Sequence, residues 1–427
     1  MVTRSLAPLD QARPDLGWRW AHLLWAPHRL GFAAAMIILI GASAWWAWVL
    51  AARVEPWWAP SLALPPIVAH GVVMTLGFMP LFVAGFQFTA GPKWLALAPP
   101  PASALRVPLA LQLVGWAAWW VGSHRGVELA ALGVATVALG QGLVAARFTS
   151  MVWHSPAPDR WHAFIIAAAG WLGVIHGAAL AAALSVHAVA LTLVLVRSAL
   201  WLAIVPVFVA ALHRLVPFFT SSALPMVDLW RPWWVLVVLL LAALAEAGFE
   251  WVTWALGGGP PRVLMLARGL FELVVGSVVL WLALVWGLVQ AMSVRLLAML
   301  HLGVLWLGLA YGLLGVAQLL GLRHGAPLLG LGAWHALTMG FLGSIMYAMV
   351  TRVSCGHGGR KLLADHATWV GFWVLQSAVV ARIVAALWPD APTLMLGAAL
   401  LWLAAVLPWG VRLLSWYGRP RPDGRPG

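Results

Sequence analysis

The segment AVALTLVLVRSALWLAIVPVFVAAL (188–212) contains one charged residue, Arg197, in 25 positions. As a helix it would be about 37 Å long, because each residue adds about 1.5 Å, and the hydrocarbon core of a bilayer is about 30 Å thick. We therefore expect this segment to span a membrane. Comparable apolar segments recur along the chain, which predicts an all-α membrane protein with about twelve transmembrane helices. The predicted spans are 30–52, 64–90, 105–122, 127–147, 161–183, 188–212, 232–255, 263–290, 298–320, 328–352, 367–388 and 393–415.

The composition excludes a soluble globular protein. Of 427 residues, 63% are apolar and 9% are charged, whereas soluble domains have about 25% charged residues. The mean hydropathy is +0.93, so the lipid bilayer is the expected solvent of the chain. No polar stretch is long enough to form a separate soluble domain. We expect one membrane domain over 1–427 with short cytoplasmic tails at about 1–29 and 416–427, the second of them disordered.

The net charge of +13 does not indicate nucleic-acid binding. The Lys and Arg residues are dispersed over short loops, whereas a nucleic-acid-binding protein collects them on one face. If the chain begins in the cytoplasm, most of the 25 basic residues fall on the cytoplasmic side, as the positive-inside rule requires. The sequence therefore predicts that both termini are cytoplasmic. The basic residues of the opposite loops are Arg53, Arg125, Arg262 and Arg323.

Two histidines lie inside predicted spans at the same depth. His70 and His335 each follow the start of an inward-running span, and each has a methionine four residues later, Met74 and Met339. Residues four apart share a helix face, and imidazole nitrogen and thioether sulfur both suit haem iron or copper. A hydrogen bond to a neighbouring helix would explain either histidine alone. Two at matched depth, beside glycines that would admit a flat ring, favour a bis-histidine haem site. The glycines are Gly71, Gly77, Gly340 and Gly343.

Three arginines lie in the outer thirds of predicted spans, where an unpaired guanidinium is costly. Arg197, Arg268 and Arg382 could bind the two haem propionates, because Arg is the best planar partner for a carboxylate. For Arg268 an ion pair with Glu272 on the next helical turn is an equal alternative. The sequence has no CxxCH motif for covalent attachment, so any haem should be a non-covalent b-type haem.

A second group of metal-binding side chains lies at the predicted cytoplasmic ends of spans. His213, His301, His357 and Cys355 could together bind copper, which has high affinity for imidazole and thiolate. The alternative is that they are solvated at the interface and that Cys355 is an ordinary reduced thiol. Five further histidines at this surface are interpreted as solvated: His22, His28, His154, His162 and His366.

A weak internal similarity links the second, sixth and tenth spans. PLFVAGFQFTAGP (80–92) parallels PVFVAALHRLVPF (206–218), and HGVVM (70–74) parallels HALTM (335–339). A spacing of four helices predicts three four-helix repeats. Chance similarity among apolar helices is the alternative.

Several motifs together resemble the NnrS family over most of the chain. They are APHRLGF (26–32), HRLVPFFTSSALP (213–225), LLAMLHLGVLWLGLAYGLL (296–314) and HALTMGFLGSIMYAMVTRVSCGHGGRKL (335–362). NnrS proteins are bacterial membrane proteins described as containing haem and copper and tied to nitric oxide and nitrosative stress. The resemblance implies a bacterial inner-membrane protein with these cofactors.

The sequence departs from the family pattern in its second span. The family pattern there is approximately His-Ala-His-Glu-Met, and this chain reads HGVVM (70–74). Val72 and Val73 replace the second histidine and the glutamate, so no metal function is expected of those two positions. His70 and Met74 remain.

The chain also resembles, more distantly, subunit I of the haem-copper oxidases, which has twelve helices in three sets of four. AHGVVM (69–74) is similar to the low-spin haem motif of the oxidase's second helix, and AWH (333–335) corresponds to the His-x-His of its tenth. Ala333 occupies the high-spin haem position and His335 the low-spin one. Arg197 stands where the oxidase has a copper histidine. The resemblance implies a low-spin haem without an oxygen-reducing centre.

With two histidine ligands a haem iron has no open position, so electron transfer or redox sensing is the predicted function. The expected partners are the lipid bilayer, haem, nitric oxide or a nitrosylated species, and a redox partner or quinol. One alternative is an enzyme acting on nitric oxide or a dinitrosyl iron species, which needs an open metal position. The other is a cofactor-free transporter whose buried charges line a path.

Overall fold

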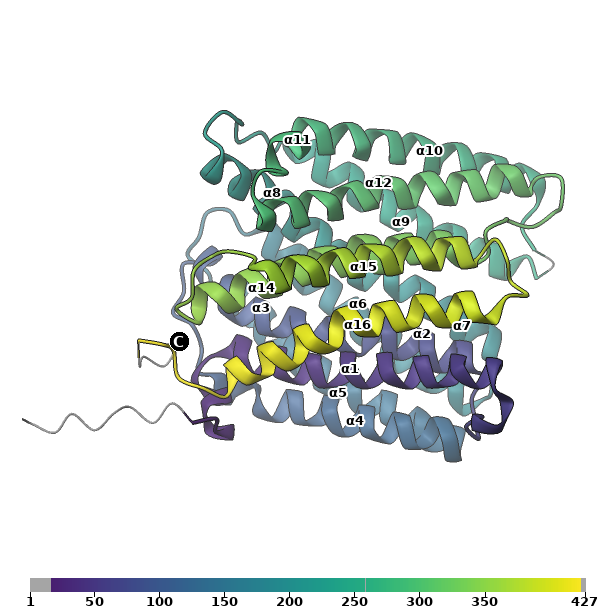
Figure 1. The fold of residues 1–427 in the computed structure, drawn as a ribbon, viewed down its shortest axis with the longest axis horizontal. Coiled ribbons are helices and arrows are strands. Elements are labelled where there is room, and N and C mark those ends of the chain that lie inside the picture. Colours follow the sequence, from purple (N-terminus) through teal and green to yellow (C-terminus); the bar gives the residue numbers. More distant parts are fainter. Residues whose placement is uncertain (1–16, 258, 424–427) are drawn as a thin grey trace, which may run out of the picture.

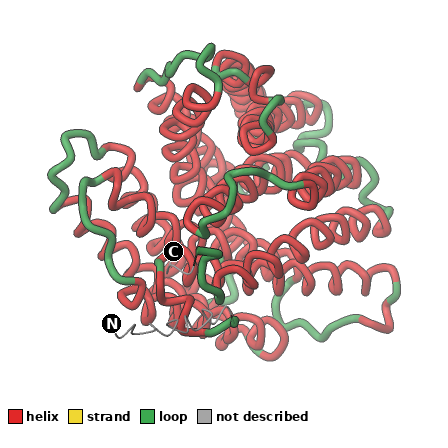
Figure 2. The backbone as a smooth tube through the Cα atoms, turned by 60° about the vertical axis from the view of Figure 1, so that its left-hand side comes forward, coloured by secondary structure: helices red, strands yellow, loops and turns green. Residues whose placement is uncertain are grey.

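The computed structural model describes residues 17–257 and 259–423. Within these residues all regular structure is helical, and no strand occurs (Figure 2). Twelve helical segments are long and apolar enough to cross a membrane, which confirms the all-α transmembrane prediction. The helices are α1 (Pro27–Val54), α2 (Pro66–Leu76), α3 (Phe78–Trp94), α4 (Arg106–Arg125), α5 (Val127–Trp153), α6 (Trp161–Ser185), α7 (Val189–Ala199), α8 (Val205–Ala223), α9 (Trp233–Ala255), α10 (Arg262–Val285), α11 (Leu288–Ala291), α12 (Arg295–Gly321), α13 (Gly332–His335), α14 (Ser344–His357), α15 (His366–Ala385) and α16 (Pro392–Tyr417), with two π-helical segments, η4 (Leu200–Ile204) and η5 (Ala336–Gly343), and three short 3₁₀ helices, η1 (Trp20–Trp25), η2 (Pro56–Trp58) and η3 (Ala102–Leu105).

Four spans are built from more than one helical segment. The second consists of α2 and α3, the third of η3 and α4, the sixth of α7, η4 and α8, and the tenth of α13, η5 and α14. The eighth span is shorter than predicted, because Gly287 adopts a left-handed conformation (φ 91°) that ends α10 and starts the short α11. Glycine adopts such a conformation without the steric cost that a Cβ would add.

The spans run side by side, and both described ends of the chain lie at the same end of the bundle (Figure 1). The backbone N–H of Arg19 donates to the carbonyl of Gly418 (2.7 Å), and the guanidinium of Arg29 donates to the carbonyls of Tyr417 and Arg419. Residues 417–419 therefore contact the start of the chain, so the prediction of a disordered tail is wrong for them. Residues 424–427 lie outside the described residues.

The helices pack at close range in two outer pairs. A Cβ added to Gly115 of α4 would lie 2.6 Å from the backbone of Gly133 in α5, and one added to Gly276 of α10 would lie 2.9 Å from the backbone of Gly312 in α12. Small residues let transmembrane helices approach until dispersion forces and backbone contacts act along their length. Buried apolar side chains from α1 to α16 form one continuous cluster. The three-repeat organisation stays a prediction.

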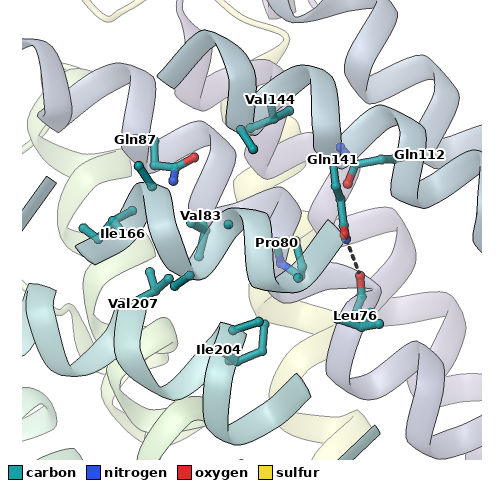
Figure 3. A pocket seen from close by; sticks show the side chains of 16 residues that line it. Leu76, Pro80, Val83, Gln87, Gln112, Gln141, Val144, Ile166, Ile204 and Val207 are labelled. Carbon is teal, nitrogen blue, oxygen red and sulfur yellow. Dashed lines mark hydrogen bonds between the residues drawn. The ribbon is translucent and has the colours of Figure 1, made fainter. Parts of the chain in front are cut away.

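The second span is interrupted at Gly77, where α2 meets α3. Pro80 has no N–H, so the carbonyl of Leu76, one turn earlier, has no donor within its own helix. The side-chain amide of Gln141 in α5 donates to that carbonyl (3.5 Å), as Figure 3 shows. In lipid a freed backbone group must find such a partner.

Replacing Gln141 with leucine should therefore destabilise the protein by about 1 kcal/mol, because the buried carbonyl of Leu76 loses its donor. Unfolding of the detergent-solubilised protein by SDS titration measures this. Gln87→Leu is the matched control: Gln87 lines the same small cavity (Figure 3), and no hydrogen bond of its side chain occurs among the described residues. Equal destabilisation by both substitutions would show that the Gln141 bond has no role of its own.

Candidate functional site

His70 and His335 face each other across the interior of the bundle. His70 lies in the second turn of α2, and His335 is the last residue of α13. Their ring centroids are 6.3 Å apart and their planes differ by 18°. This is too far for stacked rings to touch. Two imidazoles bound to one metal at about 2.0 Å, with roughly 1.1 Å from each nitrogen to its ring centre, have centroids roughly 6 Å apart.

The orientation of each imidazole is set by its neighbours. Nδ1 of His335 lies 2.7 Å from the carbonyl of Leu331, so it carries the proton and leaves Nε2 with a free lone pair. The ring of His70 stacks on Trp46 at 4.0 Å. Its Nδ1 is buried without a hydrogen-bond partner among the described residues. A carbonyl that holds one imidazole nitrogen while the other is free is the usual arrangement around a metal-bound histidine.

The two histidines line a cavity of about 400 Å³, a volume within the range of ligand pockets, about 300–1,000 Å³. The cavity lies toward the end of the bundle opposite the chain termini, because its residues come from the ends of odd-numbered spans and the starts of even-numbered ones. It brings together six of the seven residues predicted to surround a haem: His70, His335, Met74, Met339, Arg197 and Arg382.

Three guanidinium groups surround this cavity. Arg53 at the end of α1 lines it together with Arg197 and Arg382. Among the described residues, neither Arg53 nor Arg382 pairs with a carboxylate, whereas Arg197 donates to Glu250 (3.1 Å). Arg53 was not predicted to lie at this site, because the sequence shows it only as a basic residue of a short loop between two spans. Its place one residue beyond the first predicted span, on the same side of the membrane as the start of the span that contains His70, was the available signal.

Arg268 does not reach the cavity, so its predicted place beside a haem is wrong. Its Nε donates to Glu272 (2.9 Å), and its terminal nitrogen donates to Glu246 (2.7 Å) and Glu250 (2.8 Å). The alternative i,i+4 pair with Glu272 is present, extended by two carboxylates from α9. Three carboxylates attract the guanidinium more strongly than a more distant anion could.

Of the four glycines predicted to admit a flat ring, only Gly71 lines the cavity. A Cβ on Gly340 would lie 2.7 Å from Trp306, and one on Gly343 would lie 3.2 Å from Trp402. Gly77 packs against the carbonyl of Val73. These three glycines therefore serve close protein packing instead of ligand access.

The predicted copper cluster does not form. His213 lies 3.0 Å from Nε2 of His162 and contacts the carbonyl of Pro232, while His301 pairs with the hydroxyl of Thr220. The ring of His357 lies 4.9 Å from that of His28. No group of three or more His, Cys, Asp or Glu side chains able to hold a metal ion occurs in the described part of the chain. His213, His301, His357 and Cys355 do not fit one copper site, because their helices direct them to different partners.

Five other histidines were predicted to be solvated at the cytoplasmic surface, and two of them are exposed in the structure. His154 and His366 are exposed, whereas His22, His28 and His162 are buried. His22 contacts the carbonyl of Gly418 through Nδ1 (2.7 Å), which helps to hold the two ends of the chain together. Sequence position at a span end did not reveal this, because the neighbours come from distant parts of the chain.

The sixth and tenth spans both line the cavity, and each contains a π-helical segment. The segment is η4 in the sixth span and η5 in the tenth. Leu200 of η4 and Met339 of η5 line the cavity, and the rings of Trp201 and Trp334 contact each other beside it at 5.9 Å. A π-helical turn shifts the following side chains around the helix axis and is frequent at functional sites. Here it helps to direct side chains of the sixth and tenth spans to a common cavity.

A family model described as NnrS protein matches residues 22–421. The chain belongs to the NnrS family. A search of the curated proteins finds no match. The matched range includes the cavity, both histidines and all three arginines around it. This NnrS-family protein is a multi-pass membrane protein, and all the transmembrane spans found in the described residues lie within the region that the family model matches.

Proposed function

We propose that this NnrS-family protein binds a non-covalent b-type haem between His70 and His335. The observation that carries the proposal is the separation of the two imidazoles, 6.3 Å between centroids across a cavity. That separation suits one iron bound to both rings. Nδ1 of His70 is buried and has no hydrogen-bond partner among the described residues. A buried polar atom of this kind needs a partner, which a ligand or a water molecule would supply.

The donor set favours haem over a bare metal ion. A zinc ion in a protein takes three or four protein ligands, and no group of three or more His, Cys, Asp or Glu side chains able to hold a metal ion occurs among the described residues. A haem brings four nitrogen ligands of its own and needs only axial ligands from the protein. Two histidines therefore complete the coordination of a haem iron, whereas a bare ion would need further ligands.

The charges around the cavity fit the two propionates of haem. Arg53 and Arg382 line the cavity and pair with no carboxylate in the described part of the chain, and Arg197 lines the cavity while it also donates to Glu250. We propose that Arg53 and Arg382 bind the propionates, since an unpaired guanidinium inside a membrane protein is costly. Met74 and Met339 line the same cavity and would supply apolar, polarisable contacts to the haem.

When bound, the haem would supply one-electron redox chemistry. Both axial positions would be taken by histidine, so we propose electron transfer or redox sensing, with a redox partner or quinol as the other participant. We further propose a role in nitric oxide metabolism or the nitrosative-stress response, which family membership supports. In the proposed orientation, with both termini in the cytoplasm of a bacterium, the cavity lies in the outer half of the inner membrane.

The test is the visible spectrum of the protein purified in detergent after expression with haem supply. We expect a reduced-minus-oxidised spectrum of a low-spin haem, and a pyridine haemochrome spectrum that identifies it as haem b. A high-spin spectrum that changes on addition of nitric oxide would favour an enzyme with an open metal position. A colourless preparation would reject the haem and favour the transporter.

A further inference from the structure

A buried cluster of charges connects three spans beside the cavity. Arg268 of α10 donates hydrogen bonds to Glu272 on its own helix and to Glu246 and Glu250 of α9, at 2.7 to 2.9 Å. Arg197 of α7 donates to the second oxygen of Glu250 at 3.1 Å. Glu246 and Glu272 are completely buried, and Arg268 and Glu250 nearly so. Two guanidinium groups thus share three carboxyl groups within the membrane-spanning region.

The charges of this cluster do not balance if every group is ionised. Three carboxylates and two guanidinium ions leave one negative charge, and a buried net charge is costly in a medium of low polarity. The guanidinium groups cannot change their charge, because Arg stays protonated in proteins. Binding of one proton from water to a carboxylate oxygen neutralises the cluster and needs no other reactant.

The hydrogen bonding indicates where this proton lies. When both groups are treated as carboxylates, one oxygen of Glu246 and one of Glu272 are buried without a hydrogen-bond partner among the described residues. The two carboxyl groups are neighbours, because both accept hydrogen bonds from the same guanidinium, that of Arg268 (2.7 and 2.9 Å). Glu250 differs, because both of its oxygens accept bonds from guanidinium groups. A proton between Glu246 and Glu272 therefore satisfies atoms that otherwise lack a partner.

A tyrosine from a third element also faces this pair. Tyr311 of α12 is 1% exposed, and its hydroxyl has no hydrogen-bond partner among the described residues. It lies close enough to Glu246, Glu272 and Arg268 to interact with their charges. The titratable groups around the pair are thus Arg268, Glu250 and Arg197 from the cluster and Tyr311 from α12. We propose that the Glu246–Glu272 pair is a proton-binding site that holds one proton at neutral pH.

The same geometry couples the proton to the cavity. Arg197 lines the cavity and packs over Trp334, another residue of its wall, at 5.6 Å, while its guanidinium holds Glu250. A change of charge in the cavity therefore acts on the cluster through Arg197. This second part rests on the proposed haem: reduction of the iron adds a negative charge to the cavity, which should strengthen proton binding by the pair.

Infrared spectroscopy of the full-length protein in detergent tests the proton site directly. We expect a C=O stretch of a protonated carboxyl at neutral pH, with a shift in D₂O. Glu246→Gln and Glu272→Gln should each remove this band, because each variant balances the charges. Glu128→Gln, at an exposed position, should leave the band unchanged. A wild-type spectrum without the band at neutral pH, in a sample that shows it in acid, would overturn the proposal.

Aspartate substitutions locate the proton while they preserve the charge. The frequency of the band should shift in Glu246→Asp and Glu272→Asp and stay unchanged in Glu250→Asp. A shift in Glu250→Asp alone would place the proton on Glu250 and contradict the assignment to the pair.

The coupling is measured by the infrared difference between the oxidised and reduced protein. We expect the carboxyl band to change on reduction of the haem. A band that is present but insensitive to reduction would overturn the coupling and leave the proton site intact. A protein without haem would give no difference spectrum, so failure of the haem proposal is distinguishable from failure of this one.

Discussion

Replacing His70 or His335 with alanine is expected to remove the low-spin haem spectrum of the purified protein. Each imidazole would supply one ligand to the iron, and their ring centroids, 6.3 Å apart, have the separation expected for two imidazoles bound to one metal. Loss of a residue that merely supports a ligand already costs about 10–100-fold in metal affinity. Loss of a ligand should reduce haem per chain by more than about tenfold or convert the remaining haem to a high-spin form.

Three variants serve as controls for the histidine experiment. His187→Ala alters an exposed histidine and should leave both haem content and spectrum unchanged. Met74→Leu and Met339→Leu change residues of the cavity wall and should retain a bis-histidine spectrum. Full haem content with an unchanged spectrum in His70→Ala would remove His70 as a ligand, and the same result for His335→Ala would remove His335.

Replacing Arg268 with glutamine is expected to destabilise the fold by about 3–5 kcal/mol, the usual cost of removing one partner from a buried ion cluster. The substitution leaves three buried carboxyl groups with one guanidinium, Arg197, which reaches only Glu250. Glutamine cannot replace the charge of the guanidinium. The free energy of unfolding by SDS titration in mixed micelles measures this effect.

Two control variants test whether the loss of stability in Arg268→Gln is specific to the buried ion cluster. Arg262→Gln changes an exposed arginine at the start of the same helix and should change stability by less than about 0.5 kcal/mol. Glu246→Gln replaces a group proposed to share a proton by a neutral group of the same shape, so it should be much better tolerated than Arg268→Gln. Equal stability of Arg268→Gln and wild type would show that the cluster does not hold α9 and α10 together.

The sequence was sufficient to pair His70 with His335. Depth in a membrane follows from the number of residues between a side chain and the end of its span, and helix rise is constant. The same argument placed Met74, Met339 and Arg382 at the level of the cavity that they line. It failed for Arg268, which lies at a suitable depth but on a helix whose neighbour, α9, presents two glutamates to it.

The histidines at the predicted cytoplasmic ends of the spans also show that equal depth does not predict which side chains are in contact. His213, His301 and His357 share one depth, yet each contacts a different partner, and His28 and His162, which were expected to be solvated, are two of those partners. Which helices are neighbours depends on packing of side chains from distant parts of the chain. No period or spacing within a single span encodes that choice.

The sequence by itself determined the helical membrane class, the number of spans and the depth of each polar group, because these follow from local hydrophobicity and helix geometry. Only the tertiary structure decided which groups of equal depth meet. It brought Arg53 to the cavity and Arg268 to the glutamates, and it separated the side chains predicted for copper. The physical reason is that depth is a property of one helix, whereas lateral contact is a property of the whole packed bundle.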